Sequence, residues 1–222
     1  MTIFTRQRIE FAAKLLWPEK IVKVASPDIV SLPFLRELCD VFDHLVISTG
    51  GATDEEIQIA TETVKSKGKK LTLLHCISIY PNTLEISNLA RMSFLRGMAD
   101  GSGWSDHTLV AQDKIDVSRI ASMLGAGMIE RHFTILPADQ TKDGSVSITP
   151  DLLRKLSDFV KLEIDEQKRI IEREIPLWQK AIGLRKRHIT LAEALNADYF
   201  RGRFANAIGP KVVFNWEDKP IK

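Results

Sequence analysis

The sequence lacks the cysteines and the long apolar runs that mark secreted or membrane proteins. Only two cysteines, Cys39 and Cys76, occur in 222 residues, which excludes a disulfide framework and a cysteine-rich metal site. No segment approaches the roughly 20 apolar residues of a membrane span. Charged residues also interrupt the N-terminal segment, so we expect neither a signal peptide nor a membrane anchor. Reduced cysteines are typical of the cytoplasm, which is the location we expect.

An excess of charge of one sign is also absent. The 31 basic and 29 acidic residues leave a formal net charge of +2, which argues against a nucleic-acid or membrane-surface partner. The sequence contains no glycine-rich phosphate loop of the GxGxxG or GxxxxGK type, so it gives no support to nucleotide binding. Any anion that the protein binds must therefore be held by a local group of side chains.

What the sequence does contain is an alternation of short apolar runs with stretches of helical periodicity, the pattern of repeated βαβ units. The expected strands are residues 21–26 (IVKVAS), 44–48 (HLVIS), 71–76 (LTLLHC), about 98–104, and 127–133 (GMIERHF). The expected helices are residues 32–42, 53–67, 88–96, 113–124 and a long one from Pro150. The prediction is an α/β protein with a parallel sheet and helical crossovers, either doubly wound or a barrel.

Polar residues collect at the carboxyl ends of these strands, where parallel α/β folds bind ligands. They are Ser26, Ser48, His75, Ser78, Ser105, Asp106, His107, Glu130 and His132. His107 and His132 follow consecutive strands and could converge on a metal, although a histidine beside a strand is more often an ordinary core residue. Lys23 lies inside an apolar strand, which indicates either an anion-binding lysine or an edge residue whose stem reaches solvent.

Five motifs, in order between Lys20 and Leu162, resemble those of the sialic acid synthases and related nonulosonic acid synthases. They are VKVAS, ISTGGAT, LLHCISIYP, GWSDHT and IERHFT. The resemblance implies a (β/α)8 barrel of the TIM type, of which these motifs look like strands four to eight. We therefore expect residues 1–175 to form a partial barrel that lacks the first three strands. Residues 176–222 would form a C-terminal tail without a clear counterpart in the family.

The resemblance also implies an activity and a set of site residues. The family condenses phosphoenolpyruvate with an N-acetylated amino sugar, such as N-acetylmannosamine, and releases phosphate in carbohydrate biosynthesis. His107 and His132 match the ligands of a divalent metal, Mn²⁺ or alternatively Mg²⁺. The positions that match phosphoenolpyruvate-binding residues are Lys23, Ser26, Ser48 and Ser105. Ser78 and Tyr80 match substrate-holding positions, and Asp143 matches an acidic residue that contacts the sugar, so the catalytic assignments are Lys23, Ser105 and Asp143.

Departures from the family pattern leave the activity of the chain open. Nothing before Lys20 resembles the first three strands, and no segment after Pro176 resembles the family's antifreeze-like domain. One interpretation is an enzyme whose missing strands come from a partner chain or from another copy in a homo-oligomer. A second is a truncated, non-catalytic relative that binds metal or phosphoenolpyruvate, and a third is an unrelated aldolase or phosphosugar-binding barrel. The sequence does not identify the acceptor sugar.

Overall fold

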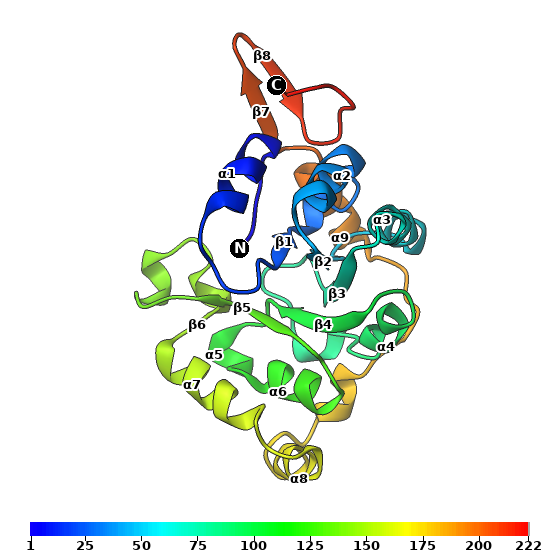
Figure 1. Ribbon diagram of the computed structural model, residues 1–222. Helices are drawn as coiled ribbons and strands as arrows, with labels where there is room; N and C mark the ends of the chain where they lie inside the picture. The colour runs from blue at the N-terminus through cyan, green and yellow to red at the C-terminus, as the bar shows by residue number, and fades with distance from the viewer. Residues whose placement is uncertain (222) are drawn as a thin grey trace. The chain divides into compact units, whose positions relative to one another are not determined.

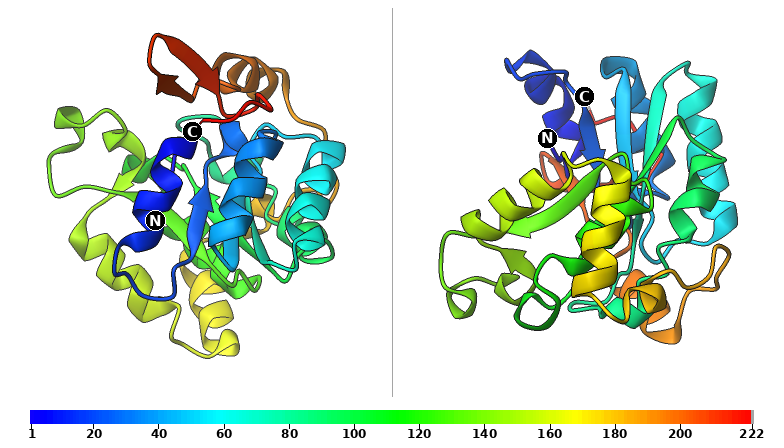
Figure 2. Two further views of the ribbon diagram at one scale, coloured as in Figure 1. Left: turned by 45° about the horizontal axis from the view of Figure 1, so that its top comes forward. Right: turned by 90° about the horizontal axis from the view of Figure 1, so that it is seen from below.

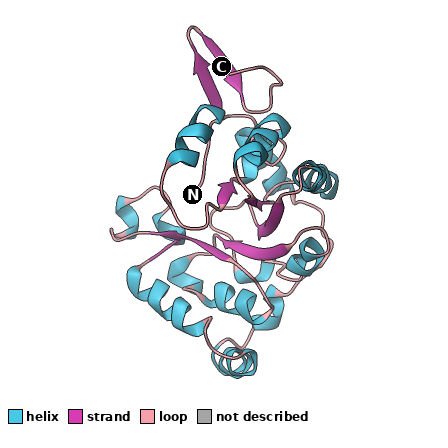
Figure 3. Ribbon diagram, in the orientation of Figure 1, coloured by secondary structure: helices cyan, strands magenta, loops and turns pink. Residues whose placement is uncertain are grey.

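Parallel strands and connecting helices alternate along most of the chain in the computed structural model, which describes residues 1–221 (Figures 1 and 3). The strands are β1 (Val22–Val24), β2 (His44–Ser48), β3 (Lys70–Cys76), β4 (Gly101–Asp106), β5 (Ile129–Phe133) and β6 (Ser147–Ile148), in the order β1-β2-β3-β4-β5-β6. The crossovers contain α2 (Leu32–Val41), α3 (Asp54–Ser66), α4 (Arg91–Arg96), and α5 (Val110–Asp113) with α6 (Asp116–Met123). The predicted α/β class, with a parallel sheet and helical crossovers, is confirmed.

The remaining elements lie before β1 and after β6. They are helices α1 (Ile9–Lys14), α7 (Pro150–Phe159), α8 (Ile164–Glu174) and α9 (Leu191–Phe200), and the antiparallel hairpin β7 (Ala205–Ile208) and β8 (Lys211–Phe214). No helix among residues 1–221 is long and apolar enough to cross a membrane.

By its internal contacts the chain forms two compact units. The first contains Met1–Leu73, Arg96–Gly101 and the residues from His188 onward, and the second contains Leu74–Leu95 and Ser102–Arg187. The first unit therefore combines β1, β2 and the start of β3 with α9 and the C-terminal hairpin. The proposed division into a partial barrel (1–175) and a tail (176–222) follows the extent of the resemblance and stays a prediction.

The core of the first unit forms where helices cover one face of β1 and β2. Val22 and Val24 of β1, with Leu45 and Ile47 of β2, are fully buried because side chains alternate along a strand and these four share a face. Helix α2 packs beside β2 and α3 packs beside α2 (Figure 2). The capping box expected between Thr53 and Glu56 is present at the start of α3. The opposite face of these strands carries Lys23 and Ser48 together with the buried Val46.

The second unit has its own core, centred on Trp104 of β4. Trp104 is fully buried and belongs to a cluster with residues from α4, α6, α7 and α8. The cluster includes Met92, Val117, Ile120, Phe159 and Ile171. Because these helices cover the Trp104 face of β4, the neighbouring residues Ser105 and His107 are directed to the other face.

Several boundaries differ from those predicted. The helix expected over 113–124 begins only at Asp116, as α6, and a separate short helix, α5, ends at Asp113, because Lys114 between them has a positive φ of 47°. Asn88 has φ 49°, and α4 begins only at Arg91. Strand β4 (Gly101–Asp106) begins and ends later in the sequence than the strand expected over about 98–104. The two-residue β6, the helix α9 and the C-terminal hairpin were not predicted, although Thr190 and Glu193 form a capping box at the start of α9.

Buried amides attach the C-terminal hairpin to the N-terminal part of the first unit. Asn206 Oδ1 accepts a hydrogen bond from the Gln7 amide at 3.0 Å, and Asn206 Nδ2 donates to Asn215 Oδ1 at 3.2 Å. Asn215 Nδ2 donates in turn to the Phe4 carbonyl at 2.9 Å and to Asp28 Oδ1 at 3.1 Å. Asn206 and Asn215 are almost inaccessible to solvent, so losing one partner would leave a buried polar group unsatisfied.

Asp28 is the one ionisable member of this network. Burial raises the pKa of Asp28 to about 6, even though hydrogen bonds from Asn215 and Ser31 act in the opposite direction. Its second oxygen, Oδ2, has no hydrogen-bond partner among residues 1–221. The folded pKa thus lies above the unfolded value, so the carboxyl favours folding at low pH. This contribution is lost as the pH rises from about 4 to about 6.

We expect Asp28→Asn to stabilise the protein at pH 7. The amide keeps an oxygen that accepts from Ser31 and Asn215 and removes the cost of a buried charge, so the free energy of unfolding should rise by about 1–3 kcal/mol. The gain should vanish near pH 3.5, where the wild-type carboxyl is protonated. Urea denaturation at both pH values measures the difference, with the exposed Asp40→Asn as the control. A variant less stable than wild type at pH 7 would show that the carboxylate is needed.

Candidate active site at the ends of β4 and β5

The register of β4 and β5 places four polar residues on one face of these strands. The two strands are parallel, and Ser105 lies opposite Glu130 while Asp106 lies opposite Arg131. His107 and His132 come one step further along, so they return to the face of Ser105 and Glu130. Asp106 and Arg131 point to the other face.

The two histidines predicted as metal ligands lie together. The ring centroids of His107 and His132 are 5.2 Å apart, with an edge-to-face angle of 66°. Tyr80, from the segment after β3, lies against both rings, at 4.0 Å from His107 and 5.9 Å from His132. Its hydroxyl is 2.9 Å from His107 Nε2. The expected proximity of the imidazoles is confirmed, and Tyr80 joins them.

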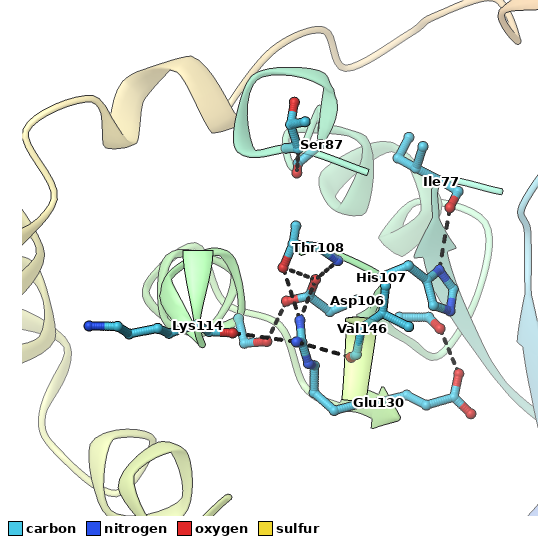
Figure 4. Close-up of polar contacts among 12 residues, drawn as sticks. Ile77, Ser87, Asp106, His107, Thr108, Lys114, Glu130 and Val146 are labelled. Atoms are coloured by element: carbon cyan, nitrogen blue, oxygen red, sulfur yellow. Dashed lines mark hydrogen bonds and ion pairs between the residues drawn. The ribbon is translucent and has the colours of Figure 1, made fainter. Parts of the chain in front are cut away.

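The second ring nitrogen of each histidine faces an oxygen that orients the ring. His107 Nδ1 lies 3.3 Å from the Ile77 carbonyl (Figure 4). Because a carbonyl only accepts hydrogen bonds, we assign the proton to Nδ1, which leaves Nε2 with a lone pair toward the Tyr80 hydroxyl. His132 Nδ1 is 3.6 Å from Asp143 Oδ2. Metal-binding histidines are commonly held in this way by a carbonyl or a carboxylate.

Burial and the neighbouring His132 lower the pKa of His107 to about 4, so its imidazole is neutral at physiological pH. Burial also raises the pKa of Tyr80 above its ordinary value, which keeps the phenol protonated and able to donate. A neutral imidazole is the protonation state that binds a metal, and here the Nε2 lone pair accepts from the Tyr80 hydroxyl.

Glu130 is a site residue to which the sequence gave no role. Ser105 Oγ donates to Glu130 Oε2 at 2.6 Å, so the hydroxyl predicted to bind phosphoenolpyruvate is oriented by this carboxylate (Figure 4). The position of Glu130 two residues before His132 on the same strand was the available signal. The negative charge of Glu130 also acts on His107 and Tyr80, in the direction that raises the pKa of each side chain.

The predicted residues of the first unit lie at the ends of β1 and β2. Lys23 is paired in register with Val46, so Lys23 and Ser48 share one face of these strands. Ser26 Oγ accepts a hydrogen bond from the Gly50 amide at 3.2 Å. Ser48 is buried, and its hydroxyl has no partner among residues 1–221, as expected of a group that meets a ligand. That Ser105 shares one anion pocket with these three residues stays a prediction.

The donors present suit an open metal site. Residues 1–221 contain no group of three or more histidine, cysteine, aspartate or glutamate side chains arranged to hold a metal. A cation at this position would have the two imidazoles as protein ligands, with water and substrate oxygens in its other coordination positions, and its binding stays a prediction. Ser78 is partly exposed in the segment that leads from β3 to Tyr80.

Comparison with known proteins agrees with the motifs. The profile of the NeuB family matches residues 1–167. The N,N'-diacetyllegionaminic acid synthase of Legionella pneumophila is 30% identical over 96% of this chain and 62% of its own length. The N-acetylneuraminate-9-phosphate synthase of Drosophila melanogaster is 32% identical over 68% of this chain and 40% of its own.

A solved structure gives the same result. The spore coat polysaccharide biosynthesis protein SpsE of Bacillus subtilis matches 78% of this chain and 48% of its own, with 28% identity and a TM-score of 0.63. These matches confirm a partial (β/α)8-type fold and exclude an unrelated aldolase barrel. The chain spans about half the length of the relatives it matches.

We expect the ring signals of His107 to remain those of a neutral imidazole from pH 8 down to pH 5. Its folded pKa lies below the unfolded value, so this group's contribution to stability is present above pH 6.5 and is lost as the pH falls toward 4. Nuclear magnetic resonance titration of the imidazole signals, assigned with His107→Gln, measures this. Tyr80 and Cys76, which lie beside His107, keep their wild-type identity in this experiment. Titration of His107 near pH 6.5 would contradict the buried environment.

Proposed function

Because the chain belongs to the NeuB family, we propose that it supplies part of an active site that condenses phosphoenolpyruvate with an N-acetylated amino sugar and releases phosphate. N-acetylmannosamine is an example of such a sugar. The observation that carries the proposal is the cluster of His107, His132 and Tyr80 beside the Ser105–Glu130 pair. A carboxylate, two imidazoles and hydroxyl donors meet there at strand ends.

Lys23, Ser26, Ser48 and Ser105 would bind phosphoenolpyruvate. The substrate carries a phosphate and a carboxylate, and a lysine ammonium with hydroxyl donors is suited to both groups. Lys23 shares a strand face with the unpartnered hydroxyl of Ser48, which supports an anion site in that part of the molecule. The Lys23 ammonium would then bind the substrate anion instead of extending into solvent.

His107 and His132 would hold a divalent cation, Mn²⁺ or Mg²⁺. When bound, the cation would act as a Lewis acid on the aldehyde oxygen of the sugar. The chain's own contribution would be orientation, because the Ile77 carbonyl accepts from the His107 ring and Asp143 Oδ2 lies 3.6 Å from His132 Nδ1. Ser78, Tyr80 and Asp143 would contact the sugar, since Tyr80 and Asp143 flank the imidazoles and remain partly exposed.

In the reaction, the enol carbon of phosphoenolpyruvate forms a bond to the aldehyde carbon, and the aldehyde oxygen takes up a proton as its C=O double bond becomes single. Water adds to the resulting cation and gives up one proton. The tetrahedral intermediate then expels phosphate, which carries off the remaining hydroxyl proton and leaves the ketone. We assign Glu130 to receive the proton of the added water, because its carboxylate lies among these groups and already accepts from Ser105. No covalent enzyme intermediate is required, and the task of the site is to stabilise charge.

The remaining part of the site would come from a partner chain or from another copy in a homo-oligomer. Residues 1–3 pair with the outer edge of β1, where the Lys23 amide donates to the Met1 carbonyl at 2.8 Å and the Lys23 carbonyl accepts from the Ile3 amide at 3.4 Å. The support for a further contribution is the length of the relatives, of which this chain spans about half. The two reduced cysteines agree with a cytoplasmic reaction.

Replacement of Lys23 tests the anion site. Lys23→Ala should weaken binding of phosphoenolpyruvate or inorganic phosphate by about 1.5–3 kcal/mol, the range for a hydrogen bond to a charged group. Isothermal titration calorimetry measures the loss, and Lys65→Ala on α3 is the matched control. Equal affinities for wild type and Lys23→Ala would show that the Lys23 ammonium does not bind the anion and instead reaches solvent from the strand edge.

Activity of the isolated chain tests the proposal as a whole. We expect the chain alone to turn over far more slowly than a complete synthase, because an open site admits water and weakens fixed charges. Displacement of a group by about 1 Å can cost roughly 100-fold in rate. Phosphate release is followed with phosphoenolpyruvate, Mn²⁺ and a panel of N-acetylated hexosamines, with and without a polypeptide that carries a relative's remaining strands.

Activity that appears only in the mixture, and is lost with His132→Ala, would support the proposal. No activity in the mixture despite binding of Mn²⁺ and phosphoenolpyruvate would favour a non-catalytic relative. Full activity of the isolated chain would show that its own copies complete the site.

A further inference from the structure

A buried ion pair lies directly behind the candidate metal ligands. Asp106 Oδ1 and Arg131 Nη1 are 2.6 Å apart, and the two side chains are 0% and 3% exposed. Asp106 directly precedes His107, and Arg131 directly precedes His132. The pair therefore joins the ends of β4 and β5 at the residues adjacent to both imidazoles.

The hydrogen-bonding capacity of Asp106 is fully used. Oδ1 accepts from the Thr108 amide at 2.9 Å and from the Thr108 hydroxyl at 2.7 Å, in addition to Arg131 (Figure 4). Oδ2 accepts from Ser118 Oγ at 2.5 Å. Ser118 belongs to α6, so the carboxylate fixes both the turn that carries His107 and the helix behind β4.

Arg131 extends the network on its own side. Its guanidinium donates to Thr108 Oγ1 at 3.0 Å, to the Lys114 carbonyl at 3.4 Å and to the Val146 carbonyl at 3.3 Å (Figure 4). Lys114 is the residue with positive φ between α5 and α6, and Val146 precedes β6. One side chain thus connects β5 to the turn after β4, to the α5–α6 junction and to the start of β6.

This arrangement specifies the strand register on which the site depends. Asp106 and Arg131 are direct neighbours across the β4–β5 ladder and lie on the face covered by α6. A slip of one residue would move every side chain of a strand to the other face. It would also separate the two charges inside the protein, which is strongly unfavourable. The buried pair therefore permits only the register that brings His107 and His132 together.

We propose that Asp106 and Arg131 are positioning residues, which hold His107 and His132 in the relative orientation needed to bind one cation. That the two histidines bind a metal is part of the proposed function, and the inference rests on it in that respect. The relative geometry of the two rings is independent of that function. Asp106 and Arg131 lie on the face opposite the imidazoles, so their effect is exerted through the strand ends.

The test measures Mn²⁺ binding by electron paramagnetic resonance and the imidazole signals of His107 and His132 by nuclear magnetic resonance, on the full chain. Arg131→Met should weaken Mn²⁺ binding by about 10–100-fold, the usual loss when a group that orients a metal ligand is removed. Its metal-free imidazole signals should also shift. Arg131→Lys keeps the charge but cannot make all the hydrogen bonds of a guanidinium. The Mn²⁺ affinity of this variant should therefore lie between those of the wild type and Arg131→Met.

Arg119→Met is the matched control. Arg119 is a largely buried arginine of the same unit that binds Asp116 and Glu174, away from the strand ends, so its loss should leave Mn²⁺ affinity and the imidazole signals unchanged. If Arg131→Met does not fold, the charge-neutral pair Asp106→Asn with Arg131→Met replaces it, with the same expected result. His132→Ala reports whether the bound Mn²⁺ depends on this site.

The outcomes separate the two proposals. Unchanged imidazole signals and Mn²⁺ affinity in a folded Arg131→Met protein would overturn the positioning role. An equal loss in Arg119→Met would do the same, because the effect would then be general destabilisation. If wild type binds no Mn²⁺ through His132 but Arg131→Met still displaces the imidazole signals, the metal assignment fails and the positioning role stands.

Discussion

The alternation of side chains along parallel strands is the constraint on which the site depends. Helices cover one face of β1 and β2 in the first unit, and one face of β4 in the second. Val22, Val24, Leu45 and Ile47 fill the covered face in the first unit, as Trp104 does in the second. Polar residues on the covered face need a buried partner, so polar residues without one are confined to the opposite face and to the strand ends. Lys23 with Ser48, and Ser105 with its hydrogen-bond partner Glu130, lie on the opposite face.

Two buried aspartates show how a partner decides the consequence of burial. Burial raises the pKa of Asp28 to about 6, because amide and hydroxyl donors alone do not offset the cost of a buried charge. Burial acts in the same direction on Asp106, but the Arg131 guanidinium and the bonds from Ser118 and Thr108 outweigh it, and the pKa of Asp106 lies below its ordinary value. Asp28 thus weakens the first unit at neutral pH, whereas Asp106 remains charged and retains its ion pair.

Local sequence signals predicted the elements whose determinants are local. The capping box of Thr53 and Glu56 and the apolar runs of β2 and β3 are examples. The proximity of His107 and His132 was predicted from the family resemblance, which places them on adjacent strands. The division between α5 and α6 was missed because Lys114 takes its backbone conformation in a tertiary setting, in which its carbonyl faces Arg131. The C-terminal hairpin was missed because distant partners, such as Gln7 and Phe4, satisfy its buried amides. Periodicity carries no information about contacts of this kind.

The contacts that orient the two imidazoles all lie within the second unit. Ile77, Tyr80 and Asp143 contact the rings directly, and Asp106 with Arg131 fixes the strands that carry them. The geometry of the histidine pair therefore does not require the strands that the longer relatives possess. Lys23, Ser26 and Ser48 belong to the first unit, which has its own core. The histidine pair and these three residues thus belong to different units. Condensation differs from metal binding and from anion binding, because its barrier depends on the mutual placement of two substrates and on exclusion of water, and these require a complete enclosure.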